Sequence, residues 1–132
     1  MQATATGTFQ VTMTPRPAGD GPAPPGLGRF VLAKTFEGGL SGRSQGEMLS
    51  AGDPATGSAG YVALEMVEGA LDGRSGRFAL QHSGTMHAGA QALAITVVPG
   101  SGGGELAGIS GRLELAIVAG VHHYTLHYEL PG

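Results

Sequence analysis

The sequence predicts an all-β domain, either a sandwich or a barrel of short antiparallel strands, and two observations support this. Apolar and polar residues alternate along most of the chain with a period of two, which is typical of half-buried strands rather than of helices. Glycine supplies 25 of the 132 residues and proline another 8, and breaks that contain glycine separate the alternating runs. Many short strands with turns between them are typical of sandwiches and barrels.

Eight runs carry the alternation. The first places Phe9, Val11 and Met13 on one side of a strand. No stretch has a helical pattern longer than about one turn, near 104–108. Residues 1–132 are expected to form a single domain, since this length is enough to bury a sizeable core. The other seven runs cover about 30–37, 43–50, 59–68, 76–83, 91–98, 111–118 and 121–130.

A short repeat marks three of the breaks between runs. The sequence Gly-Leu-Ser-Gly-Arg at 39–43 recurs, with substitutions, at 70–74 and at 108–112. Each copy lies where one predicted strand ends and the next begins, and glycine readily adopts the positive φ that sharp bends require. We therefore expect the three copies to form equivalent hairpin corners.

Proline concentrates between the first two predicted strands. Residues 15–28 contain five of the eight prolines, which predicts a polyproline-like connection. Two interpretations are open: a lid over the mouth of a barrel, or a surface loop without that role.

Composition excludes several classes of function. There is no cysteine, which excludes disulfides, thiol nucleophiles and zinc-finger sites and fits a reducing compartment. The formal net charge is -3 and the seven basic residues are scattered, so no nucleic-acid partner is predicted. The chain starts without a signal-peptide pattern and has no apolar run of about 20 residues, so we expect a cytoplasmic protein that does not bind a membrane.

One long string of motifs points to a family. The string includes residues 57–61 (Gly-Ser-Ala-Gly-Tyr), Glu65, residues 78–86, residues 98–111 and the pair His123-Tyr124. It resembles the bacterial DUF3224 family and covers nearly the whole chain. The resemblance implies an eight-stranded antiparallel β-barrel of the allene-oxide-cyclase type, with an interior cavity. Fold-level kinship to the plant cyclases suggests ligand binding or cofactor-free cyclisation as the function.

The chain has a single lysine, Lys34, in register with the apolar residues of its strand. If that face points inward, the buried ammonium needs a partner, either as a structural ion pair or as a ligand anchor. Glu65 is the natural partner, but the face opposite it on its strand, with Val62, Leu64 and Met66, is more apolar. Periodicity leaves the inward face undecided. The resemblance favours Glu65, and we expect it to meet Lys34 inside the barrel.

His82 is the third candidate catalytic residue, after Lys34 and Glu65, because it follows Phe78 and Leu80 on one face. A histidine in a barrel can act as a general base near neutral pH, or it can be a hydrogen-bonded core residue. Tyrosines in small cores also often only fill space. The predicted ligand-binding residues are Phe30, Phe36, Tyr61, Phe78, His122, Tyr124 and Tyr128.

The histidine-rich tail, residues 121–130, does not predict a metal site. On a strand His123 and His127 point to the same face but are about 13 Å apart, at about 3.3 Å per residue. Zinc lies about 2 Å from each nitrogen ligand. No metal and no cofactor are therefore predicted.

Several strands are apolar on both faces, for example Ala92 and Ala94 behind Leu93, and Ala116 behind Ile117. Apolar outer walls predict a homo-oligomer, most simply a dimer, although small alanines on a surface are also harmless.

The sequence as a whole predicts a small-molecule-binding barrel that holds an apolar ligand, with cofactor-free cyclase or isomerase chemistry as its catalytic form. The alternatives are a non-catalytic carrier or sensor, and a structural or interaction protein with a filled barrel.

Overall fold

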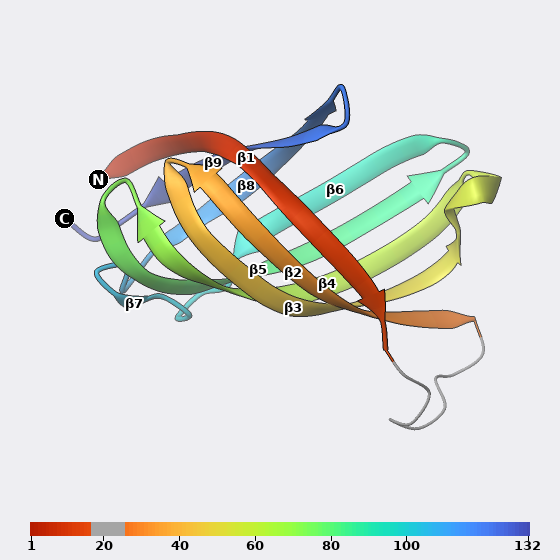
Figure 1. Cartoon of the computed structure of the whole chain (residues 1–132), viewed down its shortest axis with the longest axis horizontal. Helices are drawn as coiled ribbons and strands as arrows, with labels where there is room; N and C mark the ends of the chain where they lie inside the picture. The colour runs from red at the N-terminus through yellow and green to blue at the C-terminus, as the bar shows by residue number, and fades with distance from the viewer. Residues whose placement is uncertain (17–25) are drawn as a thin grey trace.

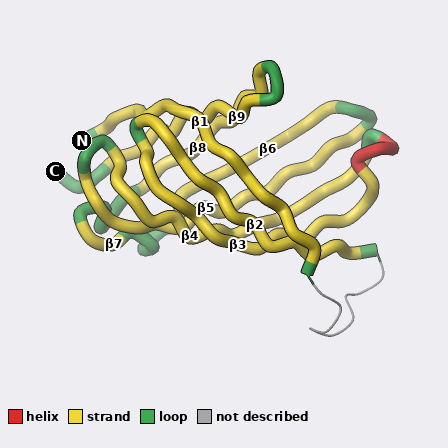
Figure 2. The backbone as a smooth tube through the Cα atoms, viewed as in Figure 1, coloured by secondary structure: helices red, strands yellow, loops and turns green. Residues whose placement is uncertain are grey.

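The computed structural model describes residues 1–16 and 26–132, which form one antiparallel sheet of nine strands (Figures 1 and 2). The strands follow the order β4-β3-β2-β1-β9-β8-β6-β5, and β4 also pairs with β5, so the sheet closes into an eight-stranded barrel. The predicted fold is thereby confirmed. The strands are β1 (Gln2–Pro15), β2 (Leu27–Gly38), β3 (Leu40–Asp53), β4 (Ser58–Leu71), β5 (Arg74–His87), β6 (Ala90–Val97), β7 (Gly103–Gly104), β8 (Ser110–Val118) and β9 (Val121–Glu129).

One connection differs from the sequence-based expectation. A 3-10 helix, η2 (Pro54–Thr56), joins β3 to β4, and the Asp53 side chain caps it by accepting a hydrogen bond from the Ala55 amide. Near 104–108 the chain forms i to i+3 hydrogen-bonded turns, in agreement with the expectation of about one helical turn at most. Most of the proline-rich segment, residues 17–25, lies outside the described residues, so both interpretations of it, the lid and the surface loop, remain open.

Each long strand turns alternate residues into the barrel, as the period of two requires. On β4, Glu65 is inside and almost fully buried, whereas Leu64 and Met66 are 57% and 52% exposed. The more apolar face of this strand therefore points outward. The inner face is the one that carries the charge.

The three repeat copies do not form equivalent corners. The copy at 39–43 begins in the turn between β2 and β3, at Gly39, and runs into β3. The copy at 70–74 spans the Asp72-Gly73 hairpin turn between β4 and β5, and the copy at 108–112 leads into β8. What they share is one apolar side chain each, Leu40, Leu71 and Ile109, packed into the same core. Each copy of the repeat therefore supplies one buried apolar side chain, while the glycine before its arginine has a different place in the backbone from copy to copy.

The two ends of the barrel differ. The end that holds both chain termini (Figure 1) is filled by side chains such as Leu40, Leu71, Phe78, Leu106 and Leu126, all buried. The long connection between β6 and β8 covers this end, and its Ser101 hydroxyl accepts a hydrogen bond from the Ala79 amide at 2.9 Å. The opposite end, near η2, is the mouth of the barrel.

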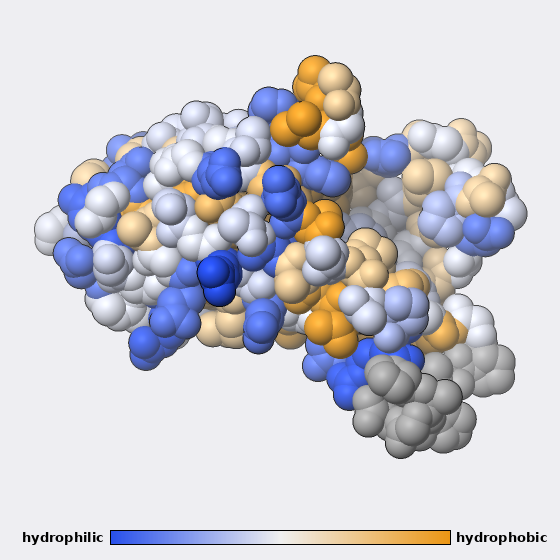
Figure 3. Space-filling view, viewed as in Figure 1, coloured by the Kyte–Doolittle hydropathy of each residue, from blue (hydrophilic) through white to orange (hydrophobic). Residues whose placement is uncertain are grey.

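The barrel wall is weakly joined at one seam. β6 and β8 pair through Thr96 and Arg112 alone, and from there the two strands diverge toward the mouth (Figure 1). The β8–β9 hairpin projects from the barrel, and apolar side chains gather at its tip (Figure 3), where Ile117, Val118 and Val121 are exposed.

Candidate functional site

A charged cluster lies inside the barrel, built from side chains of three strands, β2, β4 and β5. Lys34 on β2 places its Nζ 2.7 Å from Oε2 of Glu65 on β4. His82 on β5 places its Nε2 3.1 Å from the same oxygen. All three side chains are nearly enclosed, with exposed fractions of 8%, 0% and 5% for Lys34, Glu65 and His82. The expected meeting of Lys34 and Glu65 is confirmed, and His82 joins them.

Gly46 makes this contact geometrically possible. Lys34 and Glu65 lie on the two strands that flank β3, so the lysine must reach across β3. Glu65 pairs with Gly46, and a Cβ at residue 46 would lie 2.2 Å from the Leu64 carbonyl oxygen and 2.7 Å from the Glu65 Cα. Real atoms do not approach this closely, so glycine is required here for β3 to lie against β4.

The cluster keeps Glu65 ionised. Burial raises the pKa of this carboxyl group, but the hydrogen bond from His82 and the ion pair with Lys34 outweigh burial, so the pKa lies below its ordinary value. An ionised carboxylate only accepts hydrogen bonds, so His82 donates from Nε2. The Lys34 ammonium also lies 4.9 Å from the centre of the Phe9 ring, a favourable cation–π distance.

Two buried polar atoms in this region lack a protein partner among the described residues. Both Lys34 and His82 bond Oε2 of Glu65, and its other oxygen, Oε1, has no hydrogen-bond partner. The Ser44 hydroxyl, on the strand residue paired with Lys34, is also without one. Buried groups of this kind are costly unless satisfied, so the barrel interior retains free hydrogen-bonding capacity.

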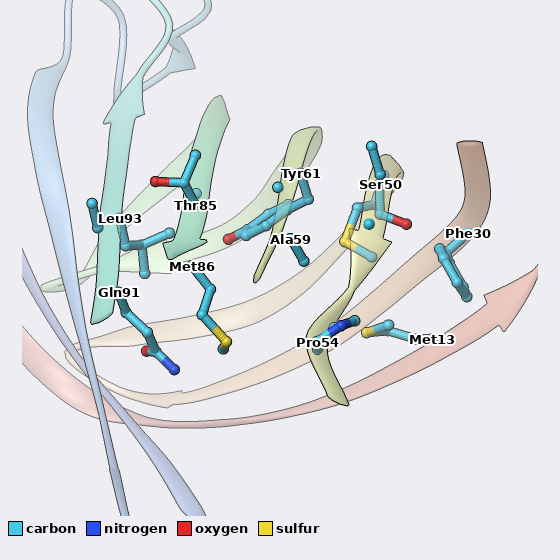
Figure 4. A pocket seen from close by; sticks show the side chains of 16 residues that line it. Met13, Phe30, Ser50, Pro54, Ala59, Tyr61, Thr85, Met86, Gln91 and Leu93 are labelled. Atoms are coloured by element: carbon cyan, nitrogen blue, oxygen red, sulfur yellow. The ribbon is translucent and has the colours of Figure 1, made fainter. Parts of the chain in front are cut away.

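A cavity of about 450 Å³ opens at the mouth of the barrel (Figure 4). This volume lies within the range of small-molecule sites. Its wall is mainly apolar, with four neutral polar side chains, Ser50, Tyr61, Thr85 and Gln91. The apolar side chains that define it are Met13, Phe30, Met48, Pro54, Ala59, Met86 and Leu93.

Tyr61 lies between the cavity and the charged cluster. Its ring centre is 6.3 Å from that of His82, while its hydroxyl points across the cavity toward Met86 and Leu93 (Figure 4). The ring covers Gly84, where a Cβ would lie 2.4 Å from the Tyr61 Cε1. Burial, and secondarily the charge of Glu65, raises the pKa of Tyr61, so its hydroxyl stays protonated and can donate.

The seven predicted ligand-binding residues lie in three different surroundings. Phe30 and Tyr61 line the mouth cavity. His122 stacks on Phe9, with ring centres 5.0 Å apart. Four others lie in the packed core and do not line this cavity: Phe36, Phe78, Tyr124 and Tyr128.

The two core tyrosines use their hydroxyls within the protein. Tyr124 accepts a hydrogen bond from the Leu40 amide at 2.9 Å and donates to the Glu37 carbonyl at 2.9 Å. Tyr128 donates to the Asp72 carboxylate, and burial together with this contact raises the pKa of Tyr128 to about 12. Both residues tie β9 to hairpin turns at the filled end.

Sequence reasoning missed the methionines of the cavity. Met13, Met48 and Met86 come from three different strands and all line it. The available signal was weak, because each methionine stands at an inward position near the end of its strand, where alternation also fits a filled core. Flexible, polarisable methionine side chains suit surfaces that adapt to apolar ligands.

Other candidate sites are poorer. A hollow of about 780 Å³ lies on the outer face of β3, β4 and β5, and its lining includes Arg16 and Glu47, which form an ion pair, together with exposed Leu64. Within residues 1–16 and 26–132, no group of three or more histidine or acidic side chains could hold a metal ion. The same residues contain no helix with the length and apolar character needed to cross a membrane.

Comparison with known proteins supports one family. The family described as "Protein of unknown function (DUF3224)" matches residues 5–128. A solved structure of a DUF3224 protein from Shewanella oneidensis MR-1, itself described as of unknown function, is 46% identical with a TM-score of 0.90. The alignment covers 100% of this chain and 99% of that one. No curated protein matches. The chain belongs to the DUF3224 family.

Proposed function

We propose that this barrel binds an apolar small molecule in its mouth cavity. The observation that carries the proposal is the apolar hollow of about 450 Å³ at an end of the barrel that side chains leave unfilled. The opposite end is packed, so an interior filled throughout, as expected of a purely structural barrel, fits the molecule less well. Concave apolar sites with a few converging polar groups are the usual form of ligand sites.

Filling the cavity should abolish binding. The neutral dye N-phenyl-1-naphthylamine brightens in apolar surroundings, and this chain has no tryptophan to interfere. Ala59 lines the cavity, and Ala59→Phe is expected to weaken dye binding at least about tenfold, because the new ring occupies the ligand's volume. Val62→Phe adds the same ring on the outward face of the same strand and should leave binding unchanged. Equal binding by the two variants, or no saturable binding by the wild type, would contradict the proposal.

A second candidate function is cofactor-free proton transfer, as in an isomerase or cyclase. One observation favours it: Glu65, His82 and Tyr61 form a row in which the buried carboxylate bonds His82, and the His82 ring lies beside the ring of Tyr61 at the cavity. With Nε2 of His82 donating to Glu65, its Nδ1 carries the lone pair that would take a proton from a carbon beside a bound carbonyl. His82 does not line the cavity, so the reacting end of the substrate would have to pass the Tyr61 ring to reach it. The Tyr61 hydroxyl would then stabilise the oxyanion.

Deuterium exchange tests this second function. With 2-decanone in D₂O, the wild type should accelerate exchange of the protons beside the carbonyl, and His82→Gln should remove the acceleration while retaining ketone binding. Equal exchange rates in the two proteins would contradict the proton-transfer function and leave ligand binding without catalysis as the proposal.

The predicted homodimer remains a proposal. It is supported by exposed apolar side chains on the outer wall, among them Leu64 and Met66 on β4 and Ile117 at the hairpin tip.

A further inference from the structure

We infer that the ligand of the mouth cavity is an electrically neutral molecule, mostly apolar, whose head group is an oxygen function such as a ketone, ester or alcohol hydrogen-bonded to Tyr61. This inference rests on the proposed binding function and narrows it to a chemical class.

The cavity wall carries no charge. Among the described residues that line it there is no lysine, arginine, histidine, aspartate or glutamate. An ionised group moved into such a site loses its hydration without gaining a counter-charge, which costs several kcal/mol or more. A carboxylate or ammonium head group therefore has no partner within the cavity.

The cation on the inward face of β2 is already committed. Lys34 lies beyond Leu32 on the inward face of β2, counting from the cavity residue Phe30, and Leu32 is only 5% exposed. Its ammonium is taken by Glu65 at 2.7 Å and is also held against the Phe9 ring. An anionic ligand would have to break this pair, and it would then face the charge of Glu65.

The free oxygen of Glu65 does not make the cavity a cation site. The Glu65 side chain is fully enclosed and does not line the cavity. Along β4, Ala63 and Tyr61 come between it and the mouth, and Ala63 is only 5% exposed. A ligand ammonium in the cavity would lie at the Tyr61 end of this row, without contact to the carboxylate.

The polar groups that do reach the cavity are neutral. The Tyr61 hydroxyl, the Ser50 hydroxyl and the Gln91 amide lie on β4, β3 and β6. Within the described part of the chain, the Tyr61 hydroxyl makes no hydrogen bond to protein, unlike those of Tyr124 and Tyr128. An unused donor in an apolar wall discriminates for a ligand that accepts a hydrogen bond there.

The methionines give a site-specific readout. The chain has five; Met13, Met48 and Met86 line the cavity, whereas Met1 is at the terminus and Met66 is exposed on the outer face. With ¹³C-methyl methionine, NMR titrations would use four probes of equal chain length: decane, 2-decanone, decanoate and decylammonium. We expect 2-decanone to shift the three cavity methyls in a saturable manner, with the other two as internal controls.

The four probes distinguish the neutral-ligand inference from the binding function on which it rests. Decanoate and decylammonium should bind at least about tenfold more weakly than 2-decanone. In Tyr61→Phe, 2-decanone should lose about three- to tenfold in affinity, with decane unchanged. Tighter or equal binding of either charged probe, or an unchanged ketone affinity in the variant, would overturn the neutral-ligand inference and leave the binding function intact. Failure of all four probes to shift the cavity methyls would overturn the binding function itself.

Discussion

Glu65→Gln is expected to lower the free energy of unfolding by about 3–5 kcal/mol, because it leaves the Lys34 ammonium buried without a counter-charge. The side chain keeps its shape, so the loss reports the charge rather than packing. Urea unfolding followed by circular dichroism at neutral pH measures it. Glu68→Gln, on the exposed face of the same strand, is the matched control and should change stability by less than about 0.5 kcal/mol. A loss below about 1 kcal/mol for Glu65→Gln would show that the pair is not the main stabilising element of this region.

A double variant without either charge tests the same idea, because it should recover stability rather than lose it. Lys34→Met combined with Glu65→Gln removes both charges and keeps a partner for His82, so it should recover most of the lost stability.

The pKa of Glu65 is lowered from 4.5 in the folded protein. Its stabilising contribution is therefore complete above that value and is lost as the pH falls through the lower folded pKa. The double variant should lose less stability than the wild type on acidification below pH 4.5.

Gly46→Ala is expected to destabilise the protein by about 1–3 kcal/mol or more, since overpacking here displaces backbone rather than a flexible side chain. The new methyl group would meet the Leu64 carbonyl and the Glu65 Cα at distances that real atoms do not adopt. The strand pair would separate where Lys34 crosses β3. Denaturant unfolding measures the stability, and the methyl NMR readout shows whether the cavity survives.

Gly60→Ala is the matched control for this substitution. Gly60 lies on β4, and a Cβ there would find its nearest atoms at 3.6 Å and 3.8 Å, which are ordinary contacts. Comparable losses in the two variants would mean that a general glycine effect, not the crossing of Lys34, explains the result.

The barrel was predictable because its main determinant is local. Alternation marked the long strands, and the inward position of Lys34 followed from its apolar neighbours on β2. Glu65 was different, because Leu64 and Met66 made the wrong face look buried. Periodicity measures only apolar content, whereas the charge on Lys34 decides which face of β4 turns inward. The family resemblance resolved what periodicity could not.

The mouth cavity was beyond local reasoning. Whether Met48 fills a core or lines a hollow depends on the side chains that face it from other strands, and a single sequence does not give that packing. The repeat was misleading for a related reason. Leu40 and Leu71 do occupy the same core, but the Gly-Arg pair that ends each copy lies in a strand at 42–43 and begins in a turn at 73–74.

The seam between β6 and β8 gives the barrel an uneven stiffness around its circumference. A closed ladder resists widening because every step would break backbone hydrogen bonds, but here only the Thr96–Arg112 bridge joins the two strands. The cavity residues Gln91 and Leu93 belong to the strand that borders this seam. We therefore expect the mouth to widen more easily between these two strands than between strands that are fully paired.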